Sequence, residues 1–529
     1  MSHTYDALVV GAGMAGLTAA CYLSKAGYRV LLFERAQKPG GLVADFTRHG
    51  FHFDAGLRAV ENSGVIEPML RQLGISLPFL PNPVSIRMGD RSVRLAEGGL
   101  EAYSSMLGEI FPVNVREIDA IRQNIEQVMD IMDVLYGIDN PLFLDLKNNP
   151  QFLLHTVLPW LVRYKINMKK MKRFLQPIEQ HLSGLTQNTA LRDMIAQHFF
   201  QNTPGFFALS YFGLYMDYRY PKGGTGALVS AMVDFLRGNG GEIQCGTEIT
   251  GIDPLSRQVT TAQGQTVHYQ KLVWAGDTKS LYEATGSFPG ASHAYKAQAA
   301  RVAKGQGGNS VLSVFLALDI PPQAAAQAFG PHCFYTPLAR GLSSLGPGSW
   351  VMSCNDDDKD SRRKALEAWL GRYFALTTYE ISCPVLRDAT LAPEGKTGLI
   401  VSTLFSAELI RAIRRDGWYA ECKEFCVQQV LLQLEQALPG IGEKRMDSLC
   451  STPLTIEKLT VNTDGAITGW SFGGKVPAES RFQKITNSVR TPIPHVYQAG
   501  QWTFSPSGLP VSVMTGKLAA DAIIKELGR

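Results

Sequence analysis

The chain has 529 residues, of which 45% are hydrophobic and 19% are charged, a composition that is typical of globular proteins and excludes a disordered chain. Its length exceeds the roughly 100–200 residues of one domain, so we expect two domains. The net charge of +4 is too small for a nucleic-acid-binding protein, which concentrates a much larger positive excess on one face.

The cysteines and apolar runs indicate a cytoplasmic protein. The eight cysteines form no CxxC pair, and Cys422 and Cys426, one helical turn apart, are expected to pack inside a helix rather than bind a metal. A strand-like run from Tyr5 leaves no room for a signal segment. The most apolar run, 152–162, contains Pro159 and is shorter than the roughly 20 residues that span a bilayer.

The first elements along the chain form a β-α-β unit around the stretch "VVGAGMAGLTAA". Residues 6–10 are a β-rich run, 14–27 a helical run, and 28–34 a second apolar run of the kind found in buried parallel strands. The glycine pattern GxGxxG lies between the first strand and the helix, and an acidic residue ends the second strand. This order of elements predicts a dinucleotide-binding site.

Each part of the motif has a physical role. The first glycine allows a tight turn, the second lets the backbone approach a pyrophosphate, and the third lets helix and strand pack closely, while the acidic residue accepts hydrogen bonds from a ribose. The helix N-terminus supplies amide donors to the phosphates. The cofactor contacts expected here are Gly11, Gly13, Met14, Ala15, Gly16 and Glu34.

The residues after Glu34 distinguish between possible cofactors. The continuation "RAQKPGGLVADFTRHGFHFDAG" holds a glycine pair and an Asp-x-Gly turn, which an NAD site does not require. It resembles the N-terminal FAD signature of the amine oxidase and phytoene desaturase superfamily, in which the glycine pair lines the cofactor. An arginine after the carboxylate suggests NADP, but it is common in that FAD signature. The resemblance implies FAD, with contacts from Arg35, Gly40, Gly41, Asp54, Gly56 and Arg58.

The next segment predicts a hairpin, "VSIRMGDRSVRL", that turns at Gly89–Asp90, followed by long helices. One helical stretch carries an apolar stripe with three- and four-residue spacing, formed by Leu154, Val157, Leu161, Tyr164, Met168, Met171 and Leu175. Basic residues lie off the stripe, namely Arg163, Lys165, Lys169, Lys170, Lys172 and Arg173. We expect either a peripheral membrane contact through 159–175 or a stripe that is buried in the second domain.

A second FAD-related block begins at Tyr220 with "YPKGGTGALVSAMVDFLRGNGGEIQCGTEITGI". It predicts a glycine turn, an amphipathic helix and a strand ending near Ile252, then a hairpin that turns at Gly264. The block resembles the central part of flavoprotein oxidoreductases, where a strand corresponding to 246–252 runs beside the adenine end of FAD. The contacts that this resemblance implies are Glu248, Ile249, Ala275, Gly276 and Asp277.

The C-terminal block, "PHVYQAGQWTFSPSGLPVSVMTGKLAADAIIKEL", predicts a strand over 495–499, a loop and a helix that runs to Leu527. Proline suits the first turn of that helix. By resemblance to the family, the helix N-terminus points at the flavin ring, where its dipole favours negative charge. Many members have an acidic residue where this chain has Gln501. The expected contacts are Gly500, Gln501, Gly508, Leu509, Pro510 and Val513.

The resemblance extends through "YPKGGTGAL" and "STPLTIEKLTVNTDGAITGW" to the phytoene desaturase, carotenoid isomerase and retinol saturase family. It implies hydride exchange between flavin N5 and a carbon of a polyene or isoprenoid lipid, in desaturation, saturation or isomerisation. The catalytic residues and the electron partner stay open. Alternatives are an FAD-dependent amine oxidase and a non-redox lipid carrier resembling GDP-dissociation inhibitors, for which an eroded flavin site is expected.

The predicted fold class is α/β. Three separated segments, 1–64, 218–286 and 475–529, are expected to assemble a Rossmann-type FAD-binding domain. The intervening segments, 65–217 and 287–474, are expected to form a second, α+β domain that binds the substrate.

Overall fold

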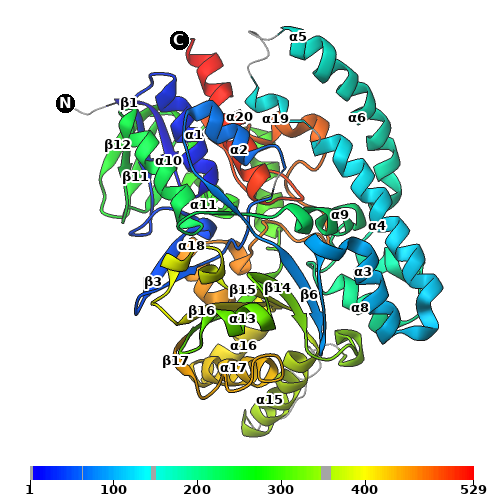
Figure 1. Ribbon diagram of the computed structural model, residues 1–529. Coiled ribbons are helices and arrows are strands. Elements are labelled where there is room, and N and C mark those ends of the chain that lie inside the picture. The colour runs from blue at the N-terminus through cyan, green and yellow to red at the C-terminus, as the bar shows by residue number, and fades with distance from the viewer. Residues whose placement is uncertain (1–3, 62, 137, 145–149, 347–358, 529) are drawn as a thin grey trace.

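The computed structural model describes residues 4–61, 63–136, 138–144, 150–346 and 359–528. It contains two seven-stranded sheets, each with its own helices. Figure 1 shows the first sheet and its helices at the upper left, the second sheet below, and a group of helices along the right-hand side. The architecture is α/β, as predicted from the alternating strand and helix runs.

The first sheet collects strands from both ends and the middle of the chain. Its order is β10-β11-β12-β1-β2-β9, with β18 paired to β12. Strand β1 is parallel to β2 and β12, and β18 is also parallel to β12. The strands are β1 Thr4–Val10, β2 Val30–Phe33, β9 Glu242–Gln244, β10 Ile249–Asp253, β11 Gln258–Thr261, β12 Thr266–Trp274 and β18 Val496–Gln498.

Helices cover both faces of this sheet. Helices α1 Met14–Lys25, α2 Ile66–Leu73, α10 Gly226–Gly238 and α20 Leu509–Leu527 share one apolar core with it. The opposite face packs against α11 Thr278–Thr285 and α12 His293–Lys304. Helices α1 and α20 cross closely, because a Cβ atom at Gly516 would lie 2.3 Å from the carbonyl oxygen of Ala15.

The second sheet has the order β17-β13-β16-β15-β14-β6-β7. All neighbouring strands in it are antiparallel except β14 and β6. The strands are β6 Val84–Met88, β7 Arg91–Arg94, β13 Ser310–Leu318, β14 His332–Thr336, β15 Tyr379–Ser382, β16 Thr397–Phe405 and β17 Arg445–Ser451. Their helices are α13 Pro322–Ala328, α15 Lys359–Leu376, α16 Ala407–Asp416 and α17 Tyr419–Leu434.

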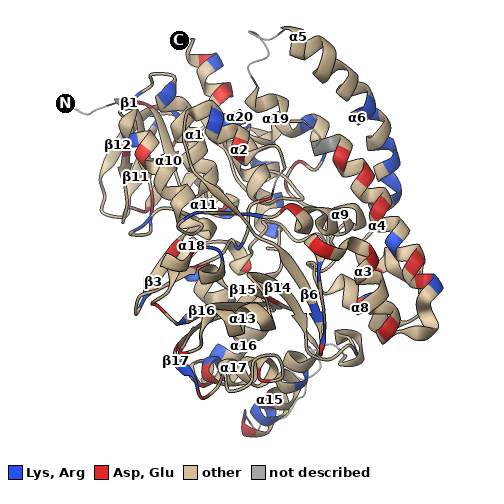
Figure 2. Cartoon of the chain, viewed as in Figure 1, with Lys and Arg blue, Asp and Glu red and all other residues tan. Residues whose placement is uncertain are grey.

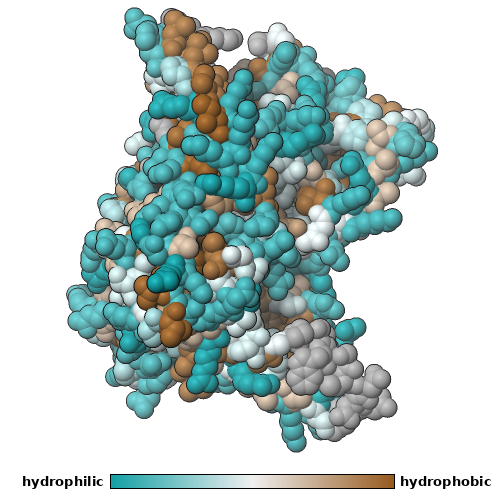
Figure 3. All heavy atoms as spheres, turned by 90° about the vertical axis from the view of Figure 1, so that its right-hand side faces the viewer, coloured by the Kyte–Doolittle hydropathy of each residue, from teal (hydrophilic) through white to brown (hydrophobic). Residues whose placement is uncertain are grey.

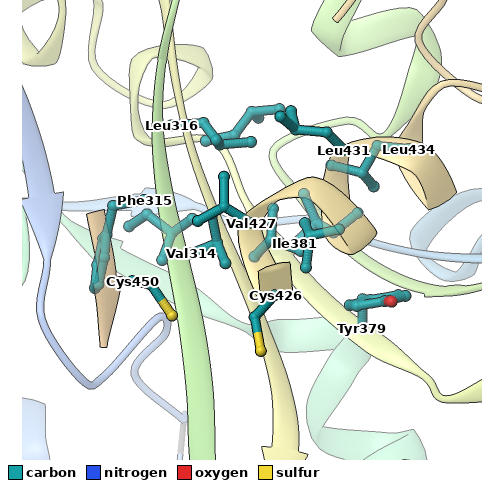
Figure 4. Packing of buried hydrophobic residues seen from close by; sticks show 14 of the residues in the cluster. Val314, Phe315, Leu316, Tyr379, Ile381, Cys426, Val427, Leu431, Leu434 and Cys450 are labelled. Atoms are coloured by element: carbon teal, nitrogen blue, oxygen red, sulfur yellow. The ribbon is translucent and has the colours of Figure 1, made fainter. Parts of the chain in front are cut away.

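The two faces of the second sheet differ in chemistry. Figure 4 shows Val427 and Leu431 of α17 packed against Val314 of β13 and Ile381 of β15. Side chains alternate between faces along a strand, so the neighbouring positions Ser313, Ser402 and Glu380, which are paired across β13, β16 and β15, lie on the other face. This second face points into the molecule and carries the polar groups described below.

The helices on the right of Figure 1 enclose a third core. They are α3 Leu95–Ile110, α4 Val115–Tyr136, α7 Ile178–Ser183, α8 Thr189–Ala196 and α9 Gly205–Leu214. Helix α6 Leu158–Met171 packs against α4 outside this core. The remaining regular elements are β3 Asp45–Arg48, β4 Phe51–Asp54, β5 Phe79–Pro81, β8 Arg219–Pro221, α5 Pro150–Phe152, α18 Pro453–Thr460 and α19 Ile485–Ser488.

Several sequence predictions about local structure are confirmed. The hairpin that turns at Gly89–Asp90 is β6–β7, and the hairpin that turns at Gly264 is β11–β12. Cys422 and Cys426 are buried within α17, and the described cysteines form no disulfide. Cys354 lies outside the described residues.

The predicted apolar stripe is divided between two faces. Val157 and Met171 are buried, whereas Leu154, Leu161 and Leu175 are between 40% and 58% exposed. At the two ends the physical reason is a change of helical pitch: residues Leu153–Val157 form a π-helical turn and Lys172–Phe174 a 3₁₀ turn, so α-helical spacing does not hold there. Within α6, Asn167 is buried in place of Leu161. No helix in the described ranges is long and apolar enough to cross a bilayer.

Candidate functional site

The glycine loop after β1 packs closely against α1 and against the residues that follow β12. Gly11 has a φ of +99°, and its Cβ would lie 3.1 Å from the carbonyl carbon of Ala275, at the end of β12. At Gly16 a Cβ would lie 1.9 Å from the carbonyl oxygen of Gly11. At Gly13, by contrast, a Cβ would meet nothing within 4 Å. The loop is therefore closed on its protein side and open at Gly13, where a ligand can approach the backbone.

The N-terminus of α1 has the donors that a pyrophosphate requires. Gly13 is the N-cap, so no side chain caps the first turn, and the first turn has no acidic residue. Met14 and Ala15 are each only 4% exposed. The first amides of a helix have no partner within the helix, and buried amides need an acceptor. The phosphates of a dinucleotide fit this requirement.

Glu34 follows β2 and is held by two backbone amides. Its Oε2 accepts from Ala12 N at 2.7 Å and its Oε1 from Ala36 N at 2.8 Å. Its own carbonyl oxygen accepts from Thr247 N at 2.9 Å, which brings the segment before β10 alongside. Each carboxylate oxygen keeps a lone pair, so the oriented carboxylate suits the two hydroxyl groups of a ribose.

The glycine pair lies against the helix N-terminus. Gly40 and Gly13 form a bridge pair, and a Cβ at Gly41 would lie 3.4 Å from the Cα of Gly13. Gly56 backs onto the same loop, because its Cβ would lie 2.2 Å from the carbonyl oxygen of Leu42. Arg35 points elsewhere, since its guanidinium donates to the carbonyl oxygen of Lys458 at the end of α18.

The C-terminal block meets the same loop. Gly500 N donates to Thr515 Oγ1 in α20 at 2.9 Å, and a Cβ at Gly500 would lie 3.5 Å from the Cβ of Ala15. Gly508 is the N-cap of α20, which has a proline in its first turn and no capping side chain. The first turn of α1 therefore lies beside Gly500 and residues 515–516 of α20.

The other predicted FAD contacts either bond to groups of the protein or lie in the core or at the surface. Asp277 accepts from Lys279 N at 2.6 Å and from Thr463 N at 2.7 Å, so it caps α11 and fixes a loop. Ile249 is buried in the core between sheet and helices, whereas Glu248 is exposed. Of the remaining predicted contacts, Gly276 follows β12, Gln501 follows Gly500, and Leu509, Pro510 and Val513 lie in α20.

Asp54 joins the N-terminal and central blocks. It is fully buried, and its carboxylate accepts from Tyr220 Oη at 2.8 Å and from both the amide and the hydroxyl of Thr225 at 2.9 Å. The glycine-rich turn before α10 is therefore attached to β4. Asp54 is a structural link between segments far apart in sequence.

Arg58 links this loop to the second sheet. Its guanidinium donates to the carbonyl oxygen of Asp54 at 2.5 Å and to Ser402 Oγ at 3.2 Å, and it is 4% exposed. Burial lowers the pKa of Arg58. The inner face of the second sheet thus lies next to the loop that carries Asp54 and Gly56.

A second polar group, Glu380, lies beside Ser402 on that face. Glu380 Oε1 is 3.0 Å from His332 Nε2, His332 Nδ1 is 3.2 Å from Asn82 Nδ2, and Asn82 Oδ1 accepts from Arg387 at 3.0 Å. His332 and Asn82 are buried, but the side chain of Glu380 is 36% exposed. The carboxylate therefore borders open space in front of the sheet.

Aromatic rings surround this polar group. Phe334 is the cross-strand neighbour of Glu380. Its ring centroid lies 4.8 Å from those of His198 and Tyr215, and the ring centroid of Tyr218 lies 5.7 Å from that of His332. Burial lowers the pKa of His198 to about 4, and neither of its ring nitrogens has a partner among the described residues. The wall is mainly aromatic, with a few polar groups, as in small-molecule sites.

A family model for flavin-containing amine oxidoreductases matches residues 14–524. The chain belongs to this family. The matched range includes the glycine loop from Met14 onward, the central block and α20. A flavin family with a dinucleotide loop indicates FAD, so the protein is an FAD-dependent oxidoreductase. When bound, FAD accepts or supplies a hydride.

Individual relatives agree with this membership over nearly the whole chain. An all-trans-retinol 13,14-reductase from Danio rerio is 23% identical over 94% of this chain and 82% of its own. A phytoene dehydrogenase from Streptomyces griseus is 24% identical over 98% of this chain and 94% of its own. The fold is similar to that of a putrescine oxidase, with a TM-score of 0.62 at 15% identity, covering 99% of this chain and all of that one.

The structure adds contacts that sequence reasoning missed. Thr515, Tyr220 and Thr225 connect the three blocks, and Glu380 lies at the inner space. The pattern "YPKGGTG" contains Tyr220 and Thr225 and was the available signal for two of them. Glu380 has no local signal, because its partners are supplied by distant segments.

Proposed function

We propose that this oxidoreductase acts on carbon–carbon bonds of a hydrophobic polyene or isoprenoid lipid, by desaturation, saturation or cis–trans isomerisation. The observation that carries the proposal is similarity over more than nine-tenths of the chain to a retinol reductase and a phytoene dehydrogenase. The aromatic wall around Tyr215 and Phe334 supports it, because a conjugated chain needs an apolar lining and few polar groups.

For the cofactor site we propose that the glycine loop, Glu34 and the glycine pair bind the FAD diphosphate and ribose. In this proposal the segments 1–64, 218–286 and 475–529 form the FAD-binding domain, and 65–217 with 287–474 form the substrate domain, except that α2 and α12 pack on the first sheet. The carrier alternative is not favoured, because it predicts an eroded site, whereas the loop geometry at Gly11, Gly13 and Gly16 is intact.

The test is anaerobic mixing of the holoenzyme with polyenes while the flavin absorbance is recorded. Loss of the oxidised-flavin absorbance when phytoene is added would identify a desaturase. Recovery of absorbance when reduced enzyme meets all-trans-retinol would identify a saturase. A polyene that changes geometry without a lasting absorbance change would identify an isomerase, and no response to any polyene would contradict the proposal.

An amine oxidase is the second candidate, and one observation favours it. The carboxylate of Glu380 borders a space walled by aromatic rings, a combination that also suits a substrate ammonium group. Bleaching of the flavin by putrescine or a larger amine, with no response to polyenes, would select this candidate.

We further propose that 159–175 contacts the surface of an anionic membrane from which a lipid substrate is taken. The outer side of α6 exposes Leu158, Val162 and Ile166 at 45%, 61% and 52%. Exposed lysines continue this side toward the C-terminus of the helix, and Figure 2 shows them in blue. The side of the molecule that carries α6 has apolar residues among hydrophilic ones (Figure 3). This combination is typical of helices that lie on lipid surfaces.

Vesicle flotation tests this contact. With vesicles of mixed neutral and anionic phospholipid, the enzyme should float, and the combined variant Lys165→Gln, Lys169→Gln and Lys172→Gln should remain at the bottom. The single variant Lys364→Gln, on α15, is a control for loss of a surface charge elsewhere on the molecule. Unchanged flotation of the triple variant would mean that these lysines are only a solvated surface.

A further inference from the structure

We propose that Glu380 is a catalytic residue that faces the substrate, stabilises positive charge on the polyene and exchanges a proton with it. The inference rests on the proposed function and assigns a residue to its chemistry. It is carried by the hydrogen-bond chain behind Glu380 and by the open space in front of it.

The chain of hydrogen bonds has only one possible direction. Arg387 can only donate, so Asn82 uses its oxygen to accept from Arg387 at 3.0 Å. The amide nitrogen of Asn82 therefore donates to His332 Nδ1 at 3.2 Å. That assigns the ring hydrogen of His332 to Nε2, which donates to Glu380 Oε1 at 3.0 Å. Arg387, Asn82 and His332 are positioning residues that fix one carboxylate oxygen.

The other carboxylate oxygen is left for a ligand. In the parts of the chain that the structure describes, Glu380 Oε2 has no hydrogen-bond partner. The side chain is 36% exposed although its partner His332 is not exposed at all. Since β15 lies in the interior of the sheet and α17 covers its opposite face, the exposed oxygen faces the aromatic space beside Phe334.

Charges around Glu380 favour the ionised form. Burial alone would raise the pKa of Glu380, but the His332 hydrogen bond and the charges of Arg58 and Arg387 outweigh it and hold the pKa below its ordinary value. Glu61 acts electrostatically on the same tyrosines as Glu380, Tyr215 and Tyr218, and burial raises its pKa to about 7. The other groups near Glu380 are Tyr215 and Tyr218. Two carboxyls with opposite shifts are typical of sites that handle protons.

The chemistry of a carbon–carbon double bond requires such a group. Desaturation breaks two C–H bonds on neighbouring carbons. One hydrogen would leave with both electrons as a hydride, which bound FAD would accept, and the carbon left behind would carry positive charge that is delocalised over the conjugated chain. An ionised carboxylate and aromatic faces stabilise that charge. The second hydrogen leaves as a proton to Glu380, and its bonding electrons become the new π bond. In saturation the sequence runs in reverse: Glu380, protonated when the apolar substrate raises its pKa, gives up the proton, and reduced FAD would supply the hydride.

The test compares Glu380→Gln, Glu380→Asp and the control Glu424→Gln, which removes an exposed carboxylate from α17. In Glu380→Gln the rate of flavin reduction by phytoene, or of flavin reoxidation by all-trans-retinol, should fall about 100-fold. Flavin content and polyene affinity should stay within about twofold. Glu380→Asp should recover part of the rate, and Glu424→Gln should match wild type.

A second readout does not depend on turnover. An apolar chain excludes water from Glu380 and should raise its pKa, so the holoenzyme should take up a proton when it binds all-trans-retinol at mildly acidic pH. Calorimetry in two buffers of different ionisation enthalpy measures this uptake, which should be absent in Glu380→Gln. Equal uptake and equal rates in wild type and Glu380→Gln would overturn the inference alone. Wild-type enzyme that binds and converts no polyene would instead overturn the proposed function, and this inference with it.

Discussion

Glu34 is the residue on which binding of the FAD ribose is expected to depend most directly. Glu34→Ala should lower the flavin content of the purified protein, because the two amides that orient the carboxylate, from Ala12 and Ala36, would be left without their acceptor. Loss of a charge-assisted hydrogen bond costs about 1.5–3 kcal/mol, or roughly 10- to 100-fold in affinity. The measurement is the ratio of flavin to protein absorbance. The control is Glu242→Gln on β9, and an unchanged ratio in Glu34→Ala would remove Glu34 from the site.

Glu61 should make stability fall as pH rises. Burial raises its pKa from 4.5 to about 7 in the folded state, so below pH 4.5 the group is neutral in both states and costs nothing. Between these pH values the unfolded chain ionises first, which favours unfolding by up to about 3 kcal/mol. Urea unfolding at either end of this range should show the loss in wild type and a smaller loss in Glu61→Gln. The same loss of unfolding free energy in wild type and Glu61→Gln would mean that Glu61 is solvated. Glu101→Gln is the surface control.

Among single residues, the sequence could identify only those that belong to a local pattern. The glycines of the loop, Glu34 and the glycine pair form a contiguous motif whose spacing implies a geometry. Glu380 lies in the short strand "YEIS", where nothing adjacent distinguishes it from a surface glutamate. Its setting depends on His332, Asn82 and Arg387, which only the folded sheet brings together.

Among the elements, α1 and α20 cross so closely that no side chain fits at Gly516. Gly516→Ala would place a Cβ 2.3 Å from the carbonyl oxygen of Ala15, and such overpacking typically costs about 1–3 kcal/mol. Because Ala15 lies in the first turn of α1, flavin content should fall together with the melting temperature. The control is Gly238→Ala in α10, where a Cβ meets nothing within 4 Å. A melting temperature equal to wild type would mean that the helices can separate without cost.

Helix α6 shows why periodicity alone gave an incomplete result. The predicted stripe has α-helical spacing, but the side of α6 that faces α4 includes Trp160, which is not in the stripe and donates to the carbonyl oxygen of Val134 at 2.6 Å, whereas Leu161 of the stripe is exposed. The π-helical turn before Leu158 changes the phase, and so does the 3₁₀ turn after Met171. Neither turn has a spacing signal in the sequence. The hairpins were predictable because a glycine turn and alternating residues specify register locally.

For the whole molecule, FAD should act as a stabilising ligand. Its expected contacts come from segments at the start, middle and end of the chain, so binding should favour the folded state by mass action, by about 2.7 kcal/mol at a concentration 100 times its dissociation constant. Removal of FAD should therefore lower the melting temperature by several degrees, and re-addition should restore it. Scanning calorimetry of the two forms measures the shift, with riboflavin, which lacks the diphosphate, as the control ligand. Identical melting of the two forms would contradict the proposed site.

The α/β class and the three FAD-related blocks could be read from the sequence, because each block carries its own glycine pattern. Of the second sheet, only the hairpin β6–β7 could be read from the sequence. The strands of that sheet come from 84–94, 310–405 and 445–451, and their order follows from long-range pairing such as β14 with β6, which no local pattern encodes. The inner polar face of that sheet was therefore also outside what the sequence could indicate.

The order of strands in the first sheet has a consequence for biosynthesis. Strand β1 and helix α1 leave the ribosome early, but β12, the parallel neighbour of β1, follows only after more than 200 intervening residues, and β18 and α20 come later still. A nascent chain therefore carries an incomplete sheet with apolar strand edges for much of translation. We expect flavin loading to be post-translational, and chains that stall before α20 to be chaperone clients rather than partly active enzyme.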